Sequence, residues 1–165
     1  MGQGRRSDMN LRFEMVLPEE KQFVEDAKQL FAEYAKSLNF SLCFQGFDKE
    51  LRGLPGEYAP PSGRLFLAFL ENKLAGCVAL RKIDDSVCEM KRLYLRPDFR
   101  GKGIGKKMTI EVVKAARDIG YSRMRLDTVP EMKEAISLYR LLGFVEISPY
   151  RENPIPGAIF MELIL

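Results

Sequence analysis

The chain has 165 residues, of which 46% are apolar and 30% charged, enough to build the core of one globular domain. The net charge is +3 and basic residues are interleaved with acidic ones, so we expect no nucleic-acid partner. No apolar stretch reaches the length of a membrane-spanning helix, and no signal-peptide pattern is visible. These features predict a cytoplasmic protein with no membrane partner.

Residues 1–10 contain Gly2, Gly4, Arg5 and Arg6 and are expected to be a flexible tail or a cloning remnant. One domain is expected over residues 11–165. Alternating apolar residues predict a strand over residues 11–17. Pro18 and the two glutamates after it begin a helix that runs to about residue 37. A short helix over residues 48–54 and a proline- and glycine-rich loop over residues 53–63 follow.

Three strands are predicted over residues 64–70, 74–83 and 87–96, and their short connections indicate antiparallel hairpins. A helix over residues 106–119 precedes a strand over 123–128 and a helix over 130–142, and each helix ends at a glycine. Strands over residues 144–147 and 158–165 complete the chain. The order β-α-α-β-β-β-α-β-α-β-β predicts an α/β fold (mixed α+β), with a central mixed, mostly antiparallel sheet and helices on both faces.

The sequence contains no histidine, which excludes Ser-His-Asp and Cys-His catalysis and argues against a zinc site. We therefore expect no metal, and a general base must be a carboxylate, Lys, Tyr, Cys or a chain of water molecules. The three cysteines, Cys43, Cys77 and Cys88, form no Cys-x-x-Cys pair and are expected to be reduced thiols.

The segment Arg-Gly-Lys-Gly-Ile-Gly at residues 100–105 lies between a predicted strand and a predicted helix. Glycines let the backbone turn sharply and approach a ligand, and the start of a helix offers unpaired N–H groups to a phosphate. The segment therefore favours a cofactor with a pyrophosphate group. Its spacing fits neither a Walker loop nor a dinucleotide fingerprint. A plain connection with basic solvent contacts is the alternative.

Two motifs, in this order, resemble those of the GNAT superfamily of N-acetyltransferases. The first is [Arg/Gln]-x-x-Gly-x-[Gly/Ala], which is matched by Arg100, Gly103 and Gly105. The second is a helix ending in Ala-x-x-Leu-Tyr-x-x-x-Gly-Phe, matched by Ala135, Leu138, Tyr139, Gly143 and Phe144. The resemblance covers about residues 11–165 and implies an N-acetyltransferase that uses acetyl-CoA.

The resemblance also implies where the cofactor binds. The pyrophosphate of coenzyme A would lie on the segment made of Arg100, Gly101, Lys102, Gly103, Ile104, Gly105 and Lys106. Leu93, Tyr94 and Leu95 would separate from the next strand and pair with the pantetheine arm. A backbone N–H near Leu93 would then polarise the thioester carbonyl. Many members carry an Asn seven residues before the helix tyrosine, where this chain has Met132.

Two residues take catalytic roles by the same resemblance. Glu89 lies eleven positions before Arg100, where one branch of the family carries its base, and an amine of pKa near ~10.4 needs one at neutral pH. The alternatives are an ion pair with Lys91 or Arg92, and a water chain as the base. Tyr139 would protonate the departing thiolate, although its helix face also suits a core tyrosine.

The acceptor is expected to be a small-molecule or peptide amine that binds residues 39–61 and 149–157. Candidate contacts are Gln45, Glu57, Tyr58 and Asp127, and Arg52 or Arg151 could hold a carboxylate. Solvated loop charges are the alternative for each. We expect direct transfer in a ternary complex, with a non-catalytic acyl-CoA sensor on the same fold as the alternative. Cys88 lacks a histidine to activate it as a nucleophile. Pairing through an edge strand could form a homodimer.

Overall fold

The computed structural model describes residues 10–42 and 46–165, so most of the predicted tail and two predicted residues, Cys43 and Gln45, lie outside the described part. The strands are β1 (Leu11–Met15), β2 (Arg64–Leu70), β3 (Lys73–Lys82), β4 (Val87–Leu95), β5 (Arg123–Thr128), β6 (Val145–Ile147) and β7 (Ile159–Ile164). The helices are α1 (Lys21–Ser37), α2 (Phe47–Arg52), α3 (Ile104–Ile119) and α4 (Lys133–Leu141). The predicted order of elements is confirmed.

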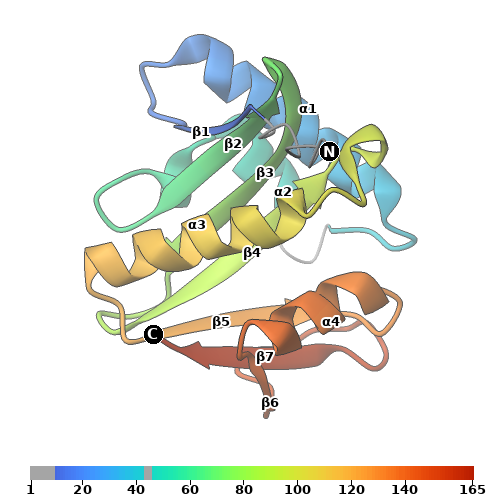
Figure 1. The fold of residues 1–165 in the computed structure, drawn as a ribbon. Coiled ribbons are helices and arrows are strands. Elements are labelled where there is room, and N and C mark those ends of the chain that lie inside the picture. The colour runs from blue at the N-terminus through green and yellow to red at the C-terminus, as the bar shows by residue number, and fades with distance from the viewer. Residues whose placement is uncertain (1–9, 43–45) are drawn as a thin grey trace, which may run out of the picture.

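The strands form one seven-stranded sheet in the order β1-β2-β3-β4-β5-β7-β6 (Figure 1). Every neighbouring pair is antiparallel except β4 and β5, which are parallel. The turn between β2 and β3 has positive φ angles at Glu71 (49°) and Asn72 (64°), as a tight two-residue hairpin turn requires. The predicted fold class, a mixed and mostly antiparallel sheet with helices on both faces, is confirmed.

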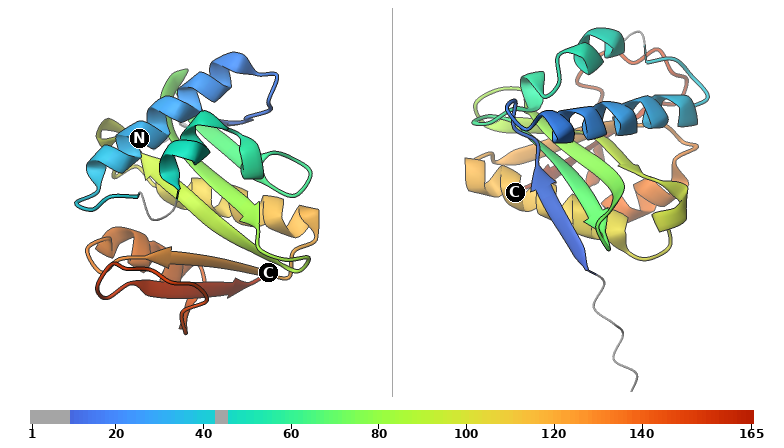
Figure 2. Two further views of the ribbon diagram at one scale, coloured as in Figure 1. Left: turned by 180° about the vertical axis from the view of Figure 1, so that it is seen from behind. Right: turned by 90° about the horizontal axis from the view of Figure 1, so that it is seen from above.

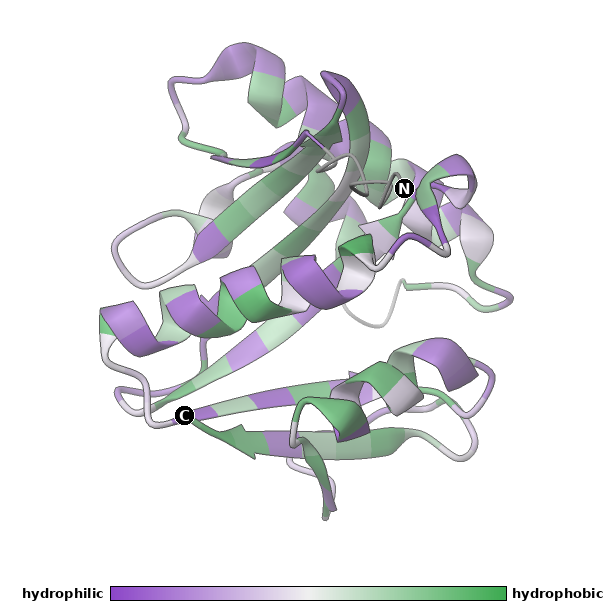
Figure 3. Ribbon diagram, in the orientation of Figure 1, coloured by the Kyte–Doolittle hydropathy of each residue, from purple (hydrophilic) through white to green (hydrophobic). Residues whose placement is uncertain are grey.

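Helices α1 and α2 cover one face of the sheet, and α3 and α4 cover the other (Figures 1 and 2). Alternating residues of the central strands enter two separate cores. Leu65, Leu67 and Cys77 pack under α1, whereas Phe66 and Val78 pack under α3. Apolar residues accordingly run almost without interruption along β2 and β3 (Figure 3), because both faces of these strands are buried.

Strands β4 and β5 separate soon after they begin. In the described part of the chain, their pairing runs from Val87 opposite Arg123 to Glu89 opposite Arg125. Beyond that point β4 continues to Leu95 and β5 to Thr128, and the two strands diverge (Figure 1). The divergence opens the middle of the sheet toward the ends of both strands.

A bulge in β4 changes the direction of its side chains. Ala79 on β3 faces Lys91, and Cys77 faces Tyr94, so two residues of β4 oppose one residue of β3. Arg92 accommodates the extra residue with a backbone φ angle of 58°, a value that residues other than glycine rarely adopt. Both Lys91 and Arg92 therefore point to the face covered by α1 and α2, and the alternation of the strand resumes at Leu93.

All four helices start at other residues than predicted. Helix α1 begins at Lys21 instead of residue 18, after a turn closed by the Glu20 N–H and the Leu17 carbonyl, and α2 begins at Phe47 instead of residue 48. Helix α3 begins at Ile104 instead of residue 106, because Gly103 (φ 77°) ends the turn and the buried Ile104 enters the core. Helix α4 begins at Lys133 instead of residue 130, because a turn closed by the Met132 N–H and the Val129 carbonyl comes first. Within the described residues, no helix is both long and apolar enough to cross a bilayer.

Candidate active site

The glycine segment forms a turn that leads from β4 into α3. Gly101 and Gly103 have φ angles of 79° and 77°, and a Cβ on either would meet no atom within 4 Å. The glycines are therefore required by the backbone conformation, since the space beside them is open. Arg100 is fixed by its Nε atom, which donates to the Leu95 carbonyl at 2.9 Å. The first N–H groups of α3 follow at this turn and suit an anion.

A groove runs from this turn toward the middle of the sheet, between the end of β4 and helix α4. Its walls include eight of the ten predicted cofactor residues, namely Leu93, Tyr94, Leu95, Arg100, Gly101, Gly103, Ile104 and Gly105. The other two, Lys102 and Lys106, are exposed beside it and do not line it. Gly105 leaves a side of the groove clear, since the nearest atom to its missing Cβ is a methyl of Leu138 at 3.9 Å.

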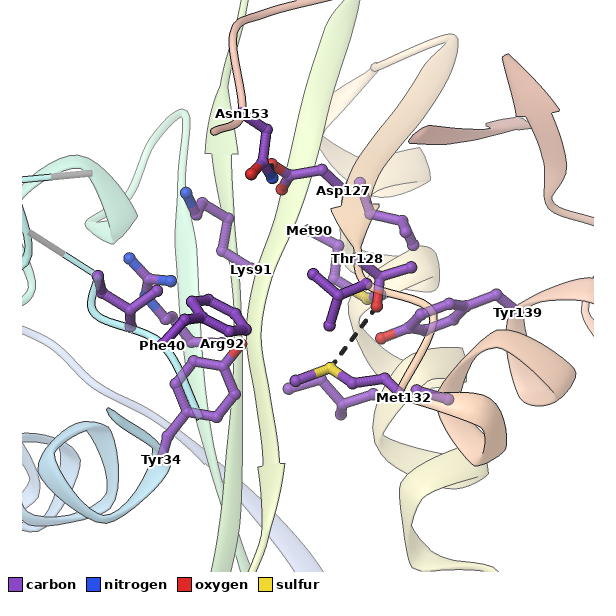
Figure 4. A pocket seen from close by; sticks show the side chains of 15 residues that line it. Tyr34, Phe40, Met90, Lys91, Arg92, Asp127, Thr128, Met132, Tyr139 and Asn153 are labelled. Carbon is purple, nitrogen blue, oxygen red and sulfur yellow. Dashed lines mark hydrogen bonds between the residues drawn. The ribbon is translucent and has the colours of Figure 1, made fainter. Parts of the chain in front are cut away.

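A second pocket continues this groove inward, between the diverging strands (Figure 4). Tyr34, Leu93, Met132 and Ala135 line both the groove and the inner pocket. A ligand in the groove would therefore meet a ligand in the pocket near Leu93. This is the arrangement that a transfer between two substrates needs, since their reacting atoms must lie about 3 Å apart.

Tyr139 lies at the inner end of the pocket. Its ring packs against Phe144, with ring centres 5.6 Å apart, and its hydroxyl points into the cavity (Figure 4). Burial raises the pKa of this hydroxyl, so the phenol keeps its proton. The residue thus combines both expectations for it: its ring is part of the core under α4, and its polar end faces the pocket.

Glu89 is fully buried and does not line the pocket. Its carboxylate accepts hydrogen bonds from Tyr150 Oη at 2.5 Å and Arg81 Nε at 3.0 Å. It also forms an ion pair with Arg151, and Lys91 Nζ lies 3.9 Å away. Of the two ion-pair partners expected for Glu89, only Lys91 is close, because Arg92 pairs with Glu50 instead. The predicted base therefore lies one layer behind the pocket wall.

Lys91 and Arg92 supply the positive wall of the pocket, and both side chains are almost completely buried. Burial, together with the nearby charges of Arg92 and Arg81, lowers the pKa of Lys91 to about 7. Arg92 donates from Nε and Nη2 to the two carboxylate oxygens of Glu50, at 2.9 and 3.3 Å. Its guanidinium also lies 5.5 Å from the centre of the Phe47 ring.

Asp127 lies on the opposite wall of the pocket, near the end of β5. It accepts a hydrogen bond from Asn153 Nδ2 at 3.1 Å, and Arg151 Nε lies 3.8 Å away. The backbone N–H of Ile155 donates a hydrogen bond to the side-chain oxygen of Asn153 and so orients this amide. The connection between β6 and β7 therefore closes this side of the pocket, as expected for residues 149–157.

The other predicted acceptor contacts lie elsewhere. Tyr58 is buried and donates to Glu50 at 2.7 Å, and Glu57 is bound to Arg81 at 2.9 Å. Both line a separate depression beside α2, and Gln45 lies outside the described residues. The structure thus brings Asp127, but neither Glu57 nor Tyr58, to the inner pocket. Cys88 is buried in the core, and burial raises its pKa to about 12, which disfavours a nucleophilic thiolate.

Several pocket residues were not singled out from the sequence. Phe40 and Leu42 reach the pocket from residues 39–61, a segment expected to bind the acceptor, but neither was named as a contact. Tyr34 reaches the pocket from α1, where its spacing predicts a core residue. Lys91 was expected only as a possible partner of Glu89. Its position in the wall depends on the divergence of β4 from β5 and on the bulge at Arg92, which no local pattern of residues predicts.

Comparisons with known proteins agree with this geometry. An uncharacterized N-acetyltransferase of Schizosaccharomyces pombe is 39% identical over 144 residues, which cover 86% of this chain and 88% of that protein. N-acetylaspartate synthetase of Danio rerio is 29% identical over 126 residues, 75% of this chain and 45% of that protein.

Among solved structures, a GNAT family acetyltransferase of Elizabethkingia anophelis with acetyl-CoA bound has a TM-score of 0.65 at 20% identity. The match covers 94% of this chain and 99% of that one, and it shows the fold. Residues 24–144 match the acetyltransferase (GNAT) family itself. The chain therefore belongs to the acetyltransferase (GNAT) family of N-acetyltransferases, as its two motifs predicted.

Proposed function

We propose that this protein transfers the acetyl group of acetyl-CoA directly to a primary amine while both substrates are bound. The observation that carries this proposal is the meeting of the groove and the inner pocket at Leu93. An amine in the inner pocket would approach the thioester without displacing a cofactor that lies in the groove. The relative named N-acetylaspartate synthetase favours a small-molecule acceptor over a peptide.

The cofactor would lie in the groove. The turn with Gly101 and Gly103 would receive the pyrophosphate on backbone N–H groups, and the basic side chains around it would add long-range attraction. The pantetheine arm would follow the edge of β4 that faces β5, where the ladder between the two strands has ended. A backbone N–H near Leu93 would then stabilise the oxyanion that forms on the thioester carbonyl.

Proton transfers would involve the polar groups at both ends of the inner pocket. The Tyr139 hydroxyl, which keeps its proton and faces the pocket, would donate that proton to the departing thiolate. Glu89 lies behind Lys91, so we infer that it receives the proton of the amine through Lys91 or a water molecule, not by direct contact. Most of the rate enhancement would come from positioning and preorganised dipoles.

The direct test is release of the coenzyme A thiol with acetyl-CoA and a panel of amines, with the product identified by mass. We expect acetylation of at least one amine, by sequential kinetics without an acetyl-enzyme intermediate. Tight binding of acetyl-CoA without acetylation of any amine would instead favour a non-catalytic sensor. Ping-pong kinetics, or an acetyl group on the protein, would contradict direct transfer.

A further inference from the structure

Strand β1 forms one edge of the sheet. It pairs with β2 on one side, and among the described residues no strand pairs with its outer side. The right-hand view of Figure 2 looks toward this edge and shows β1 in front of the other strands. An edge strand is a template for pairing with another strand, unless proline, repelling charges or a covering element prevents it. Because β1 contains no proline, its charges decide whether it can pair.

The backbone groups of alternate residues in β1 point outward. At one end of the strand the Glu71 N–H donates to the Asn10 carbonyl at 3.0 Å, and at the other the Val16 N–H donates to the Leu65 carbonyl at 2.8 Å. The register with β2 is unbroken along β1, and in antiparallel pairs the bonded residues alternate with non-bonded ones. The N–H and carbonyl groups of residues 11, 13 and 15 therefore point away from β2.

The charges of β1 are complementary to those of a second copy. If two copies pair antiparallel with Phe13 opposite its own copy, each Arg12 faces Glu14 of the partner subunit. Arg12 and Glu14 lie 3.1 Å apart, with 40% and 38% of their side chains exposed, so both are accessible to a partner. Arg12 is held by a 2.8 Å bond to Asn72, and its guanidinium lies 4.4 Å from the centre of the Phe69 ring. Opposite charges at facing positions stabilise a strand pair.

The other face of β1 is apolar and partly exposed. Leu11 and Phe13 are only partly buried against the core under α3, and 37% of Met15 is exposed. In the same pairing, Phe13 meets its own copy and Leu11 meets Met15 of the partner subunit. Apolar and aromatic pairs across two strands add to the stability of the pairing. The pairing therefore buries apolar surface that the single chain leaves exposed.

The opposite edge of the sheet suits such a pairing less well. Strand β6 has three residues, and the central one is Glu146. A full antiparallel pairing of two β6 strands would place Glu146 opposite its own copy, and like charges at facing positions are destabilising. Of the two edges, β1 is thus the one whose charges fit a second copy.

We propose that two copies of this protein pair antiparallel through β1, around Phe13, so that one sheet runs through both. The outward N–H and carbonyl groups of residues 11, 13 and 15 bond to those of the partner subunit, and two Arg12–Glu14 pairs fix the register. The inference goes beyond the proposed function, because β2 and β3 separate β1 from the candidate active site. The interface is small, so we expect a reversible dimer with micromolar affinity.

The test exchanges the charges of β1. Sedimentation equilibrium of the full chain up to about 100 µM should show a reversible monomer–dimer equilibrium. Arg12→Glu and Glu14→Arg each place like charges opposite one another and should weaken dimerisation by about tenfold or more. An equimolar mixture of the two variants should associate again, because every acidic position of one variant then faces a basic position of the other. Glu146→Arg on β6 is the matched control and should leave the dimer unchanged.

A parent chain that stays monomeric at about 100 µM would overturn the inference, and so would a dimer that both single variants retain. Failure of the mixture to associate, with both variants folded by circular dichroism, has the same meaning. Amide hydrogen exchange tests the parent without any variant. The amides of Leu11, Phe13 and Met15 should exchange more slowly at high concentration than after dilution, and equal rates would contradict pairing through β1. Acetyl transfer by either single variant should match that of the parent, so loss of the dimer leaves the proposed function intact.

Discussion

The hydroxyl of Tyr150 donates a hydrogen bond of 2.5 Å to Glu89, and so joins the connection before β7 to the last residue of β4 that pairs with β5. Glu89 also binds Arg81 and Arg151, so one buried carboxylate holds three segments together. The residue expected from the sequence to be the base is thus equally a structural anchor. The two roles lead to different measurable effects.

Glu89→Gln should lower both stability and activity. The amide keeps the shape of the side chain but removes the buried anion that Arg81 and Arg151 share, so that only Glu57 stays beside Arg81 and only Asp127 beside Arg151. This should cost about 3–5 kcal/mol of unfolding free energy. Chemical denaturation measures the first effect, and thiol release below the unfolding transition measures the second. Glu162→Gln is the matched control, because Glu162 on β7 also holds two arginines, Arg123 and Arg125, away from the pocket. Glu162→Gln should lower stability and leave activity unchanged. If Glu89→Gln also loses stability without losing activity, Glu89 has no role in proton transfer.

Tyr139→Phe should lower kcat by about 100-fold or more and leave the fold intact. The substitution keeps the ring against Phe144 and removes only the hydroxyl that faces the pocket, a typical general-acid loss. Steady-state kinetics and thermal unfolding check the two parts. Tyr121→Phe removes another buried hydroxyl, bonded to the Ser62 carbonyl at 2.7 Å, and should reduce stability without changing kcat. An unchanged kcat in the Tyr139 variant would show that Tyr139 is a core residue whose hydroxyl does not take part in catalysis.

Gly105→Leu should abolish cofactor binding with little loss of stability. Gly105 has ordinary helical geometry, and its nearest neighbour at the missing Cβ is 3.9 Å away, so the new side chain would enter the groove. Calorimetry with coenzyme A measures the effect, for which we expect an affinity loss of about 100-fold or more. Lys114→Leu, further along the same helix and exposed, should bind as the parent does. Retained affinity in the Gly105 variant would place the cofactor elsewhere.

Lys91→Met should stabilise the protein at neutral and acidic pH. Lys91 faces Arg92 and Glu89 on its own strand, Arg81 on β3, Asp127 on β5 and Glu50 on α2. Its pKa is about 7 in the folded chain and near ~10.4 in the unfolded one, so the unfolded state binds more protons between these values. The contribution of Lys91 to stability therefore rises with pH across this window.

The advantage of Lys91→Met over the parent should accordingly shrink by about 2–3 kcal/mol between pH 6 and pH 9. Urea denaturation of both proteins at the two pH values checks this, because other groups cancel in the difference. A gap that is independent of pH would show that Lys91 titrates at its ordinary pKa in the folded chain.

The sequence was sufficient for the elements whose signals are local. Glycines at residues 101 and 103 mark the turn before α3, and the short connection at residues 71–73 predicts the hairpin, whose turn consists of Glu71 and Asn72. Most of the residues that line the groove were named from the sequence, since they come from one continuous segment and one helix, each with a motif that resembles those of the family. The long helices followed from apolar periodicity, with errors of two or three residues where a glycine or a turn delays or advances the start.

The inner pocket was only partly predictable, because its walls come from five separate segments. Asp127 was found from the end of a strand, but Glu57 and Tyr58, from the loop before β2, face a different depression. The surroundings of Glu89 depend on Arg81 and Tyr150, which lie 8 and 61 residues away. Contacts of that kind arise from tertiary packing and produce no periodic pattern in the amino-acid sequence.

The short pairing between β4 and β5 has a thermodynamic consequence. Three residues on each strand join two otherwise separate half-sheets, β1 to β4 and β5 to β7, and the cavity between them lies where further ladder bonds would have formed. A ligand that contacts both β4 and β5 in this cavity adds contacts between the two half-sheets that the strands themselves do not make there. Its binding energy therefore appears directly as resistance to unfolding. Melting-temperature shifts across a compound library would then rank acceptors even before one of them is seen to react.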